Sequence, residues 1–170
     1  MKSYQLFTIG YEGRDIREFV DRLKNHNVTR LLDIRQVPFS RKKGFSKSAL
    51  QEILESENIE YVHLQSLGTP TVMRNKLKED KDYGHFFDTY GKYLSKHLEA
   101  VKEAYKFLSE GVNCIMCFER HPNECHRQVV AKKIKEYDGN GLLINHIWDP
   151  LAIPQKENPD HRYGLPESKQ

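Results

Sequence analysis

Short apolar segments alternate with helical patterns along most of the chain, and this alternation constrains the fold more than any other feature. Strand-like runs cover residues 5–9, 28–34, 59–64, 112–118 and 142–148. Strands that alternate with helices through short connections favour a parallel sheet with helices on both faces. We therefore expect an α/β fold: a single three-layer domain with a mainly parallel sheet of about five strands, flanked by helices.

The segments between these runs carry apolar residues at helical intervals of three and four. Ile16, Phe19 and Leu23 form one such stripe, and the spacing predicts helices near residues 16–23, 48–54 and 90–108, with another beginning near Cys125. Residues 71–85 are polar and charged, and we expect an irregular excursion or a short helix there.

A length of 170 residues suits one domain. We assign residues 1–149 to the α/β domain and residues 150–170 to a proline-rich tail, which we expect to be extended or loose. The tail holds four of the seven prolines, Pro150, Pro154, Pro159 and Pro166.

Composition and patterning exclude several protein classes. No apolar run approaches the roughly 18 residues of a membrane helix, so no membrane partner is expected. The first residues lack a signal-peptide pattern, which predicts a cytoplasmic protein. Three cysteines make no disulfide framework, and we expect Cys114 and Cys117 to behave as reduced, small hydrophobic residues. The sequence indicates no oligomeric state.

Polar residues follow four of the expected strands, at the edge where parallel sheets bind their ligands. Arginine forms two-pronged hydrogen bonds with phosphate, and glycine lets backbone approach a ligand. Scattered solvated charges on loops are the alternative reading. The candidates for binding an anion or a substrate are Gly10, Tyr11, Arg35, Ser40, Arg41 and Arg127.

The stretch from Cys117 to Arg127 crosses from a buried strand into a helix and is the most informative in the chain. Free N–H groups at a helix start favour anions and lower the pKa of a thiol. We predict Glu119 or His126 as the acid or base, and Cys125 as a nucleophile if it is exposed. Alternatively, Cys125 is a packed structural residue and Arg127 pairs with Glu119 or Asp33.

Known thiol motifs fit this stretch poorly. A thiol phosphatase needs an arginine six residues after its cysteine, but Asn123 and Ala131 occupy the positions that Cys117 and Cys125 would require. Cys114 and Cys117 have redox spacing, yet they lie inside an apolar strand rather than at a helix start.

Metal binding is an open alternative, although we assign no metal ligands and the sequence requires no cofactor. Magnesium could bind beside a phosphate through the carboxylates of Glu12, Asp33 and Glu119. The possible zinc ligands are Cys117, His121, Cys125 and His126, whose spacing matches no usual paired-ligand motif.

The loop of residues 39–45 mixes cations with two aromatic residues. Phe39, Arg41, Lys43 and Phe45 could contact a nucleic-acid backbone and stack on bases. A small loop with solvated lysines explains the same composition.

Four separated motifs appear in order: Thr8-Ile-Gly10-Tyr-Glu, residues 32–41 around Arg35, Tyr61 through Gly68, and Cys117 through Arg127. Together they resemble the bacterial and archaeal family called domain of unknown function 488, over roughly residues 4–137. The resemblance implies an α/β fold whose arginine, serine–arginine and cysteine–histidine–arginine motifs share a pocket. It implies no reaction.

Our leading hypothesis is an enzyme that acts on a nucleic acid, a nucleotide or another phosphorylated substrate at an arginine-rich pocket. Nucleic acid or nucleotide is thus the expected partner. The alternatives are a non-catalytic module that binds nucleic acid or a phosphorylated ligand, and a thiol-dependent enzyme that uses Cys125.

Overall fold

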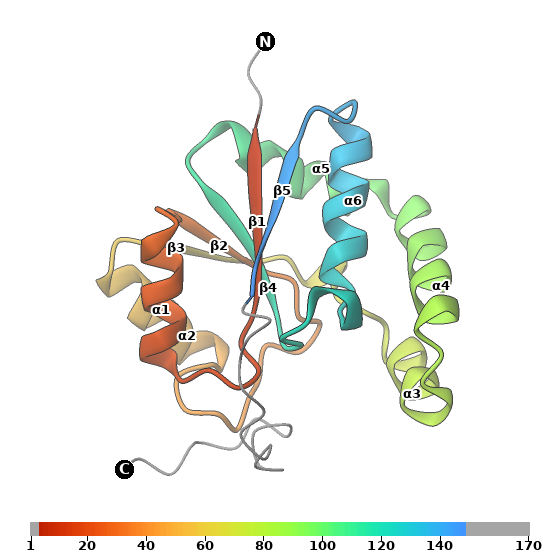
Figure 1. Ribbon diagram of the computed structural model, residues 1–170, viewed down its shortest axis with the longest axis horizontal. Helices are drawn as coiled ribbons and strands as arrows, with labels where there is room; N and C mark the ends of the chain where they lie inside the picture. Colours follow the sequence, from red (N-terminus) through yellow and green to blue (C-terminus); the bar gives the residue numbers. More distant parts are fainter. Residues whose placement is uncertain (1–3, 149–170) are drawn as a thin grey trace.

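The computed structural model describes residues 4–148 and contains a five-stranded sheet with helices on both faces (Figure 1). The strands are β1 (Gln5–Gly10), β2 (Arg30–Asp33), β3 (Glu60–His63), β4 (Asn113–Cys117) and β5 (Leu143–Ile147). The α-helices are α1 (Ile16–Asn25), α2 (Lys47–Ser56), α3 (Thr71–Asp80), α4 (Tyr83–Ser95), α5 (Leu98–Lys106) and α6 (Arg127–Tyr137). Single-turn helices are η1 (Gln65–Leu67), η2 (Phe107–Ser109) and η3 (Pro122–Glu124).

All neighbouring strands are parallel, in the order β3-β2-β4-β1-β5. The expected α/β class and the number of strands are confirmed. No helix among residues 4–148 has the length and apolar character needed to cross a membrane. The predicted tail, residues 150–170, lies outside the described residues.

Two hydrophobic cores cover the two faces of the sheet. Side chains alternate between the faces along each strand, so Leu6 of β1 enters one core and Phe7 the other. Helices α1 and α2 cover the face that holds Phe7, while α4, α5 and α6 cover the opposite face. Because both faces are covered, the central strands are apolar on both sides, which explains their near-continuous hydrophobic sequence.

The region before β4 differs from its prediction. The long helix expected over residues 90–108 is two helices, α4 and α5, separated near His97. Both pack against α6, so the apolar spacing continues across the break and hides it. For residues 71–85 the expectation was an irregular excursion or a short helix, and the structure has the helix α3 there, which buries no residue and therefore has no apolar stripe. Lys81 ends α3 in the left-handed conformation, with φ of 52°.

The chain leaves β1 and β4 in opposite directions. From β1 it passes through α1 to β2, and from β4 it passes through α6 to β5 on the other side of the sheet. Helices α1 and α6 lie on opposite faces, so the chain continues from β1 to one face of the sheet and from β4 to the other (Figure 1). Such a switch point is where open parallel sheets usually bind ligands.

Candidate functional site

The loops that follow β1 and β4 are joined by backbone contacts. The N–H of Tyr11 donates to the carbonyl of Cys117 at 3.2 Å, and the N–H of Glu12 donates to Phe118 at 2.9 Å. A Cβ atom at Gly10 would lie 1.8 Å from the carbonyl oxygen of Glu119. Only glycine fits there, so the geometry explains Gly10 by close packing of the two loops.

Arg127, the first residue of α6, is fully buried beneath this crossing. Its Nε donates to Thr8 Oγ1 at 3.2 Å, its Nη1 donates to the carbonyl of Glu119, and its Nη2 donates to the carbonyl of Arg120 at 3.0 Å. Burial lowers the pKa of Arg127 to about 10. The guanidinium thus ties α6 and β1 to the loop after β4. Its predicted contact with an anion remains a prediction.

Arg35 forms a buried pair with Asp33 at the end of β2. Two parallel bonds of 2.9 and 2.8 Å join the guanidinium to the carboxylate, which also accepts from the Tyr61 hydroxyl at 2.5 Å. Burial by itself would lower the pKa of Arg35, but the bonds to Asp33 raise it above its ordinary value. The ring of Tyr11 lies beside Arg35 and is itself buried. Both side chains are thus held by contacts within the protein. The anion contacts expected of Arg35 and Tyr11 remain predictions.

The loop of residues 39–45, which mixes cationic and aromatic side chains, has some of them in the protein interior. Lys42 is buried and donates from Nζ to the carbonyl of Tyr11 at 3.1 Å, and Phe45 is fully buried. Ser40 uses its hydroxyl to accept the N–H of Lys42 at 3.1 Å, which shapes the turn. Phe39 is 68% exposed, and Arg41 is exposed as well. Lys43 is exposed too, so Phe39, Arg41 and Lys43 are the side chains of the loop that could meet a ligand.

Cys117 and Cys125 form a disulfide, while Cys114 is a free, buried thiol. The expectation that Cys117 is a reduced hydrophobic residue was wrong. The turn η3 reverses the chain after β4 and returns Cys125 to the end of that strand, a tertiary effect for which the spacing of eight residues gives no signal. Cys125 is fully buried, so the exposure that its predicted nucleophilic role requires is not met in this structure.

Acidic and imidazole side chains surround the two sulfurs. Glu119 Oε2 lies 3.5 Å from the sulfur of Cys117, and His126 Nδ1 lies 3.9 Å from the sulfur of Cys125. Burial raises the pKa of Glu119 to about 7 and lowers the pKa of His126 to about 4. Of the three predicted catalytic residues, Glu119 is the one with partial exposure, and the catalytic roles remain predictions.

One ligand atom from each of Cys117, Glu119, Cys125 and His126 lies within 4.8 Å of the others, which makes this set capable of holding a metal ion. Three of the four residues considered for zinc are thus brought together. The fourth, His121, accepts the N–H of Asn123 instead, and Glu119 takes its place. The sequence analysis considered Glu119 for magnesium rather than for zinc; the structure brings it to the two cysteines and His126 after β4 ends.

The carboxylates considered for magnesium do not form a set. Asp33 is paired with Arg35, and Glu12 Oε1 accepts the N–H of Arg120 at 3.0 Å. Of these three carboxylates, Glu119 alone belongs to the metal-capable set.

Several buried polar atoms at this edge of the sheet have no hydrogen-bond partner among the described residues. They are Arg14 Nη2, Thr69 Oγ1, Arg74 Nε and Arg120 Nε. Sequence reasoning did not name Arg14 or Arg74. The position of Arg14 in the loop after β1 was a usable signal, whereas Arg74 lies on α3, which has no apolar pattern.

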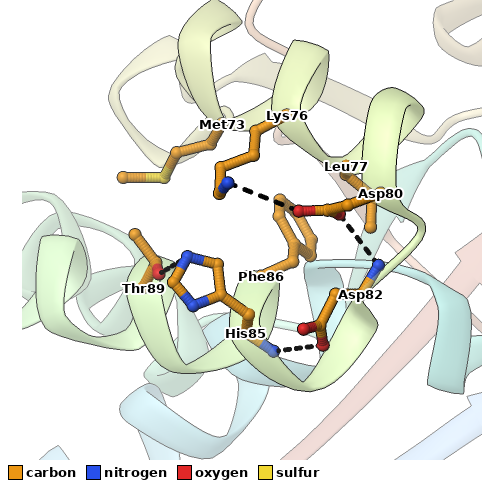
Figure 2. A pocket seen from close by; sticks show the side chains of 8 residues that line it. All are labelled: Met73, Lys76, Leu77, Asp80, Asp82, His85, Phe86 and Thr89. Carbon is orange, nitrogen blue, oxygen red and sulfur yellow. Dashed lines mark hydrogen bonds and ion pairs between the residues drawn. The ribbon is translucent and has the colours of Figure 1, made fainter.

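A small pocket lies apart from these residues, between α3 and α4 (Figure 2). Its polar groups bond to one another: Lys76 pairs with Asp80 at 3.4 Å, and Asp82 accepts the N–H of His85 at 3.0 Å. None of the predicted site residues lines it. The pocket therefore gives no support for a site away from the sheet edge.

Comparison with curated proteins and with solved structures gave no match. The family described as domain of unknown function DUF488 matches residues 15–134, which is most of the chain and includes α1, β2, β4 and the cysteine crossing. The chain therefore belongs to the DUF488 family.

Proposed function

We propose that this protein is an enzyme that acts on a nucleic acid, a nucleotide or another phosphorylated substrate, and that it binds a phosphate group between the loops after β1 and β4. The observation that carries the proposal is the pair of buried guanidinium nitrogens, Arg14 Nη2 and Arg120 Nε, that have no partner among the described residues. A buried donor without an acceptor costs free energy, and a bound anion would remove that cost.

The two arginines differ in how firmly they are held. Arg14 is fully buried, and it donates from Nε to the carbonyl of Gly10 at 3.2 Å and from Nη1 to Glu18 at 3.0 Å. These bonds fix the guanidinium and leave Nη2. Arg120 is partly exposed, so solvent reaches part of its side chain. A buried donor beside a partly exposed one suits capture of a phosphate group that approaches from solvent.

Electrostatics supports the same position. Burial lowers the pKa of Arg14, and the positive charges of Arg22 and Arg120 lower it further, although Glu18 acts in the opposite direction. A Cβ atom at Gly13 would lie 3.2 Å from Arg120 Nη1, so the glycine lets this arginine lie against the loop after β1. An anion beside Arg14 and Arg120 would relieve the repulsion between like charges.

The binding test uses inorganic phosphate and a nucleoside monophosphate, titrated calorimetrically into the full chain. Arg120→Ala should weaken phosphate binding about tenfold, or about 1.4 kcal/mol, because a charge-assisted bond is lost. Lys106→Ala removes the same charge from an exposed site at the end of α5 and should leave the affinity unchanged. Equal affinities for wild type and Arg120→Ala would overturn the assignment of the site.

Turnover separates an enzyme from a non-catalytic module that binds the same ligands. A panel of nucleotides and of single- and double-stranded nucleic acids, incubated with the protein and resolved by chromatography, should yield product from at least one member. Binding of the ligands without chemical change across the panel would favour the module instead.

A further inference from the structure

Four side chains with metal-binding atoms meet where β4 ends and α6 begins. Cys117 closes β4, Glu119 lies on the bend after it, and Cys125 and His126 directly precede α6. Two sulfurs, one imidazole nitrogen and one carboxylate oxygen are the donor types that zinc prefers, in the number that a tetrahedral site requires. We propose that the reduced chain binds a zinc-class divalent metal ion through Cys117, Glu119, Cys125 and His126. The inference is independent of phosphate binding at Arg14 and Arg120.

The orientation of the His126 ring fits this role. Its Nδ1 faces the sulfur of Cys125 at 3.9 Å, while its Nε2 faces the carbonyl oxygen of Ile34 at 3.4 Å. Histidine ligands usually donate their second ring N–H to such an acceptor, which fixes the tautomer and the ring. The ring of Tyr90 packs edge-on against His126, with centroids 5.3 Å apart, and restricts it further. Nδ1 is therefore the ligand atom.

Arg127 supplies the charge balance and the outer hydrogen bonds. Its backbone N–H points to the sulfur of Cys125 at 3.4 Å, and its Nη1 points to the sulfur of Cys117 at 3.7 Å. Two thiolates and one carboxylate carry three negative charges, of which a divalent cation compensates two. The buried guanidinium compensates the third, so the centre with its arginine is neutral. Zero net charge favours a buried metal centre, because an uncompensated charge is costly to remove from water.

The disulfide and the metal centre exclude each other, because a disulfide sulfur is not a thiolate. The Cα atoms of Cys117 and Cys125 lie 7.5 Å apart, whereas bonded cysteines usually have Cα atoms about 4.4–6.8 Å apart. A tetrahedral zinc ion holds two thiolates about 3.8 Å apart, which suits a wider separation.

Reduction by a phosphine makes the ligands available. The phosphine takes oxygen from water and becomes a phosphine oxide, while the disulfide becomes two thiols. The metal ion then displaces both thiol protons as two metal–sulfur bonds form. In this state Glu119 is a ligand rather than an acid or a base.

The experiment titrates Co²⁺ into the full chain, first in its oxidised form and then after reduction with tris(2-carboxyethyl)phosphine. The reduced chain should bind one equivalent and show a thiolate-to-cobalt charge-transfer band, which Zn²⁺ then abolishes by displacement. The oxidised chain should show no band. This comparison needs no substitution, so it stands even where a variant folds poorly.

Matched variants locate the ligands. Cys125→Ala should weaken binding about 100-fold and reduce the charge-transfer band, whereas Cys114→Ala, which removes the free buried thiol, should leave both unchanged. Glu119→Gln should weaken binding at least about tenfold while the band persists. His121→Ala should have no effect. Circular dichroism of each variant reports its folding.

Absence of a cobalt–thiolate band from the reduced wild type would overturn the proposal. A band that persists at full strength in folded Cys125→Ala would overturn it as well. Equal losses in His121→Ala and Glu119→Gln would show that the ligand set is wrong.

Discussion

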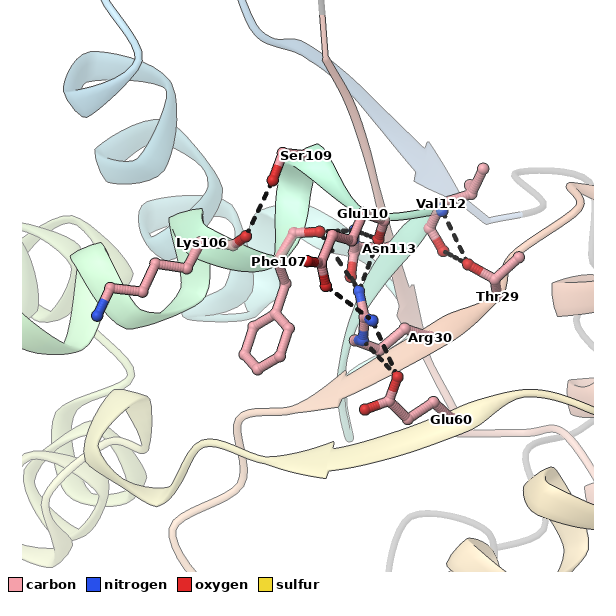
Figure 3. Close-up of polar contacts among 9 residues, drawn as sticks. All are labelled: Thr29, Arg30, Glu60, Lys106, Phe107, Ser109, Glu110, Val112 and Asn113. Atoms are coloured by element: carbon pink, nitrogen blue, oxygen red, sulfur yellow. Dashed lines mark hydrogen bonds and ion pairs between the residues drawn. The ribbon is translucent and has the colours of Figure 1, made fainter.

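Buried arginines lie at both ends of the parallel strands, but their hydrogen bonds differ. We call the end where the strands begin the amino edge of the sheet, and the end where they finish the carboxyl edge. At the amino edge, Arg30 donates to Glu60 at 2.9 Å, to the carbonyl of Glu110 at 2.7 Å and to Asn113 at 3.1 Å (Figure 3). Its guanidinium also lies 4.8 Å from the centre of the Phe107 ring. At the carboxyl edge, Arg14 and Arg120 retain nitrogens without partners among the described residues.

This difference distinguishes two roles of a buried arginine: to stabilise the fold, or to bind a ligand. An arginine whose nitrogens all meet protein acceptors stabilises the fold, because removal of the cation leaves those acceptors unsatisfied. An arginine that bonds to the protein through only some of its guanidinium nitrogens has N–H donors left for a ligand. The carboxyl edge contains both kinds, since Arg35 and Arg127 are paired internally while Arg14 and Arg120 are not fully paired.

The largest expected effect tests whether Arg35 belongs to the structural kind. Asp33→Asn removes the charge that pairs with Arg35 and should lower the free energy of unfolding by about 3–5 kcal/mol. Urea denaturation measures the loss. An unchanged affinity for phosphate, measured on the folded variant, would assign Arg35 to stability, whereas an altered affinity would return it to the binding site.

A smaller loss is expected at the amino edge. Arg30→Met keeps the apolar stem but removes the short bond to the carbonyl oxygen of Glu110 and the donor to Asn113 Oδ1, which should cost about 2–3 kcal/mol in urea denaturation. Phosphate affinity should stay within about twofold of wild type, because Arg30 lies at the opposite end of the strand from the site. Weaker phosphate binding by this variant would break the distinction between the two edges.

The smallest change in stability is expected at the exposed loop. Arg41→Ala should alter the free energy of unfolding by less than about 0.5 kcal/mol. If the loop contacts single-stranded nucleic acid, the plot of log affinity against log salt should become shallower by about 0.7. Fluorescence anisotropy with a labelled oligonucleotide measures this slope, with Lys106→Ala as the control. Identical slopes for all three proteins would exclude a contact through Arg41.

Some of the carboxyl edge could be predicted from sequence. The rule that loops after parallel strands meet at one end of the sheet agrees with the contacts among Gly10, Glu119 and Arg127. It could not tell which donors point inward. Arg35 has a partner two residues away in Asp33, but Arg127 is held by backbone carbonyls, which have no sequence signature.

The sequence by itself determined the α/β class and the five strands. For the central strands β1, β2 and β4 the reason is that burial on both faces of a parallel sheet requires near-continuous apolar runs. The sequence also contained the family motifs. The tertiary structure decided which groups meet: η3 returns Cys125 to Cys117, the bend after β4 brings Glu119 to the same point, and the switch between β1 and β4 brings Arg14 near Arg120. These contacts depend on the path of the chain through space, which periodicity and spacing do not encode.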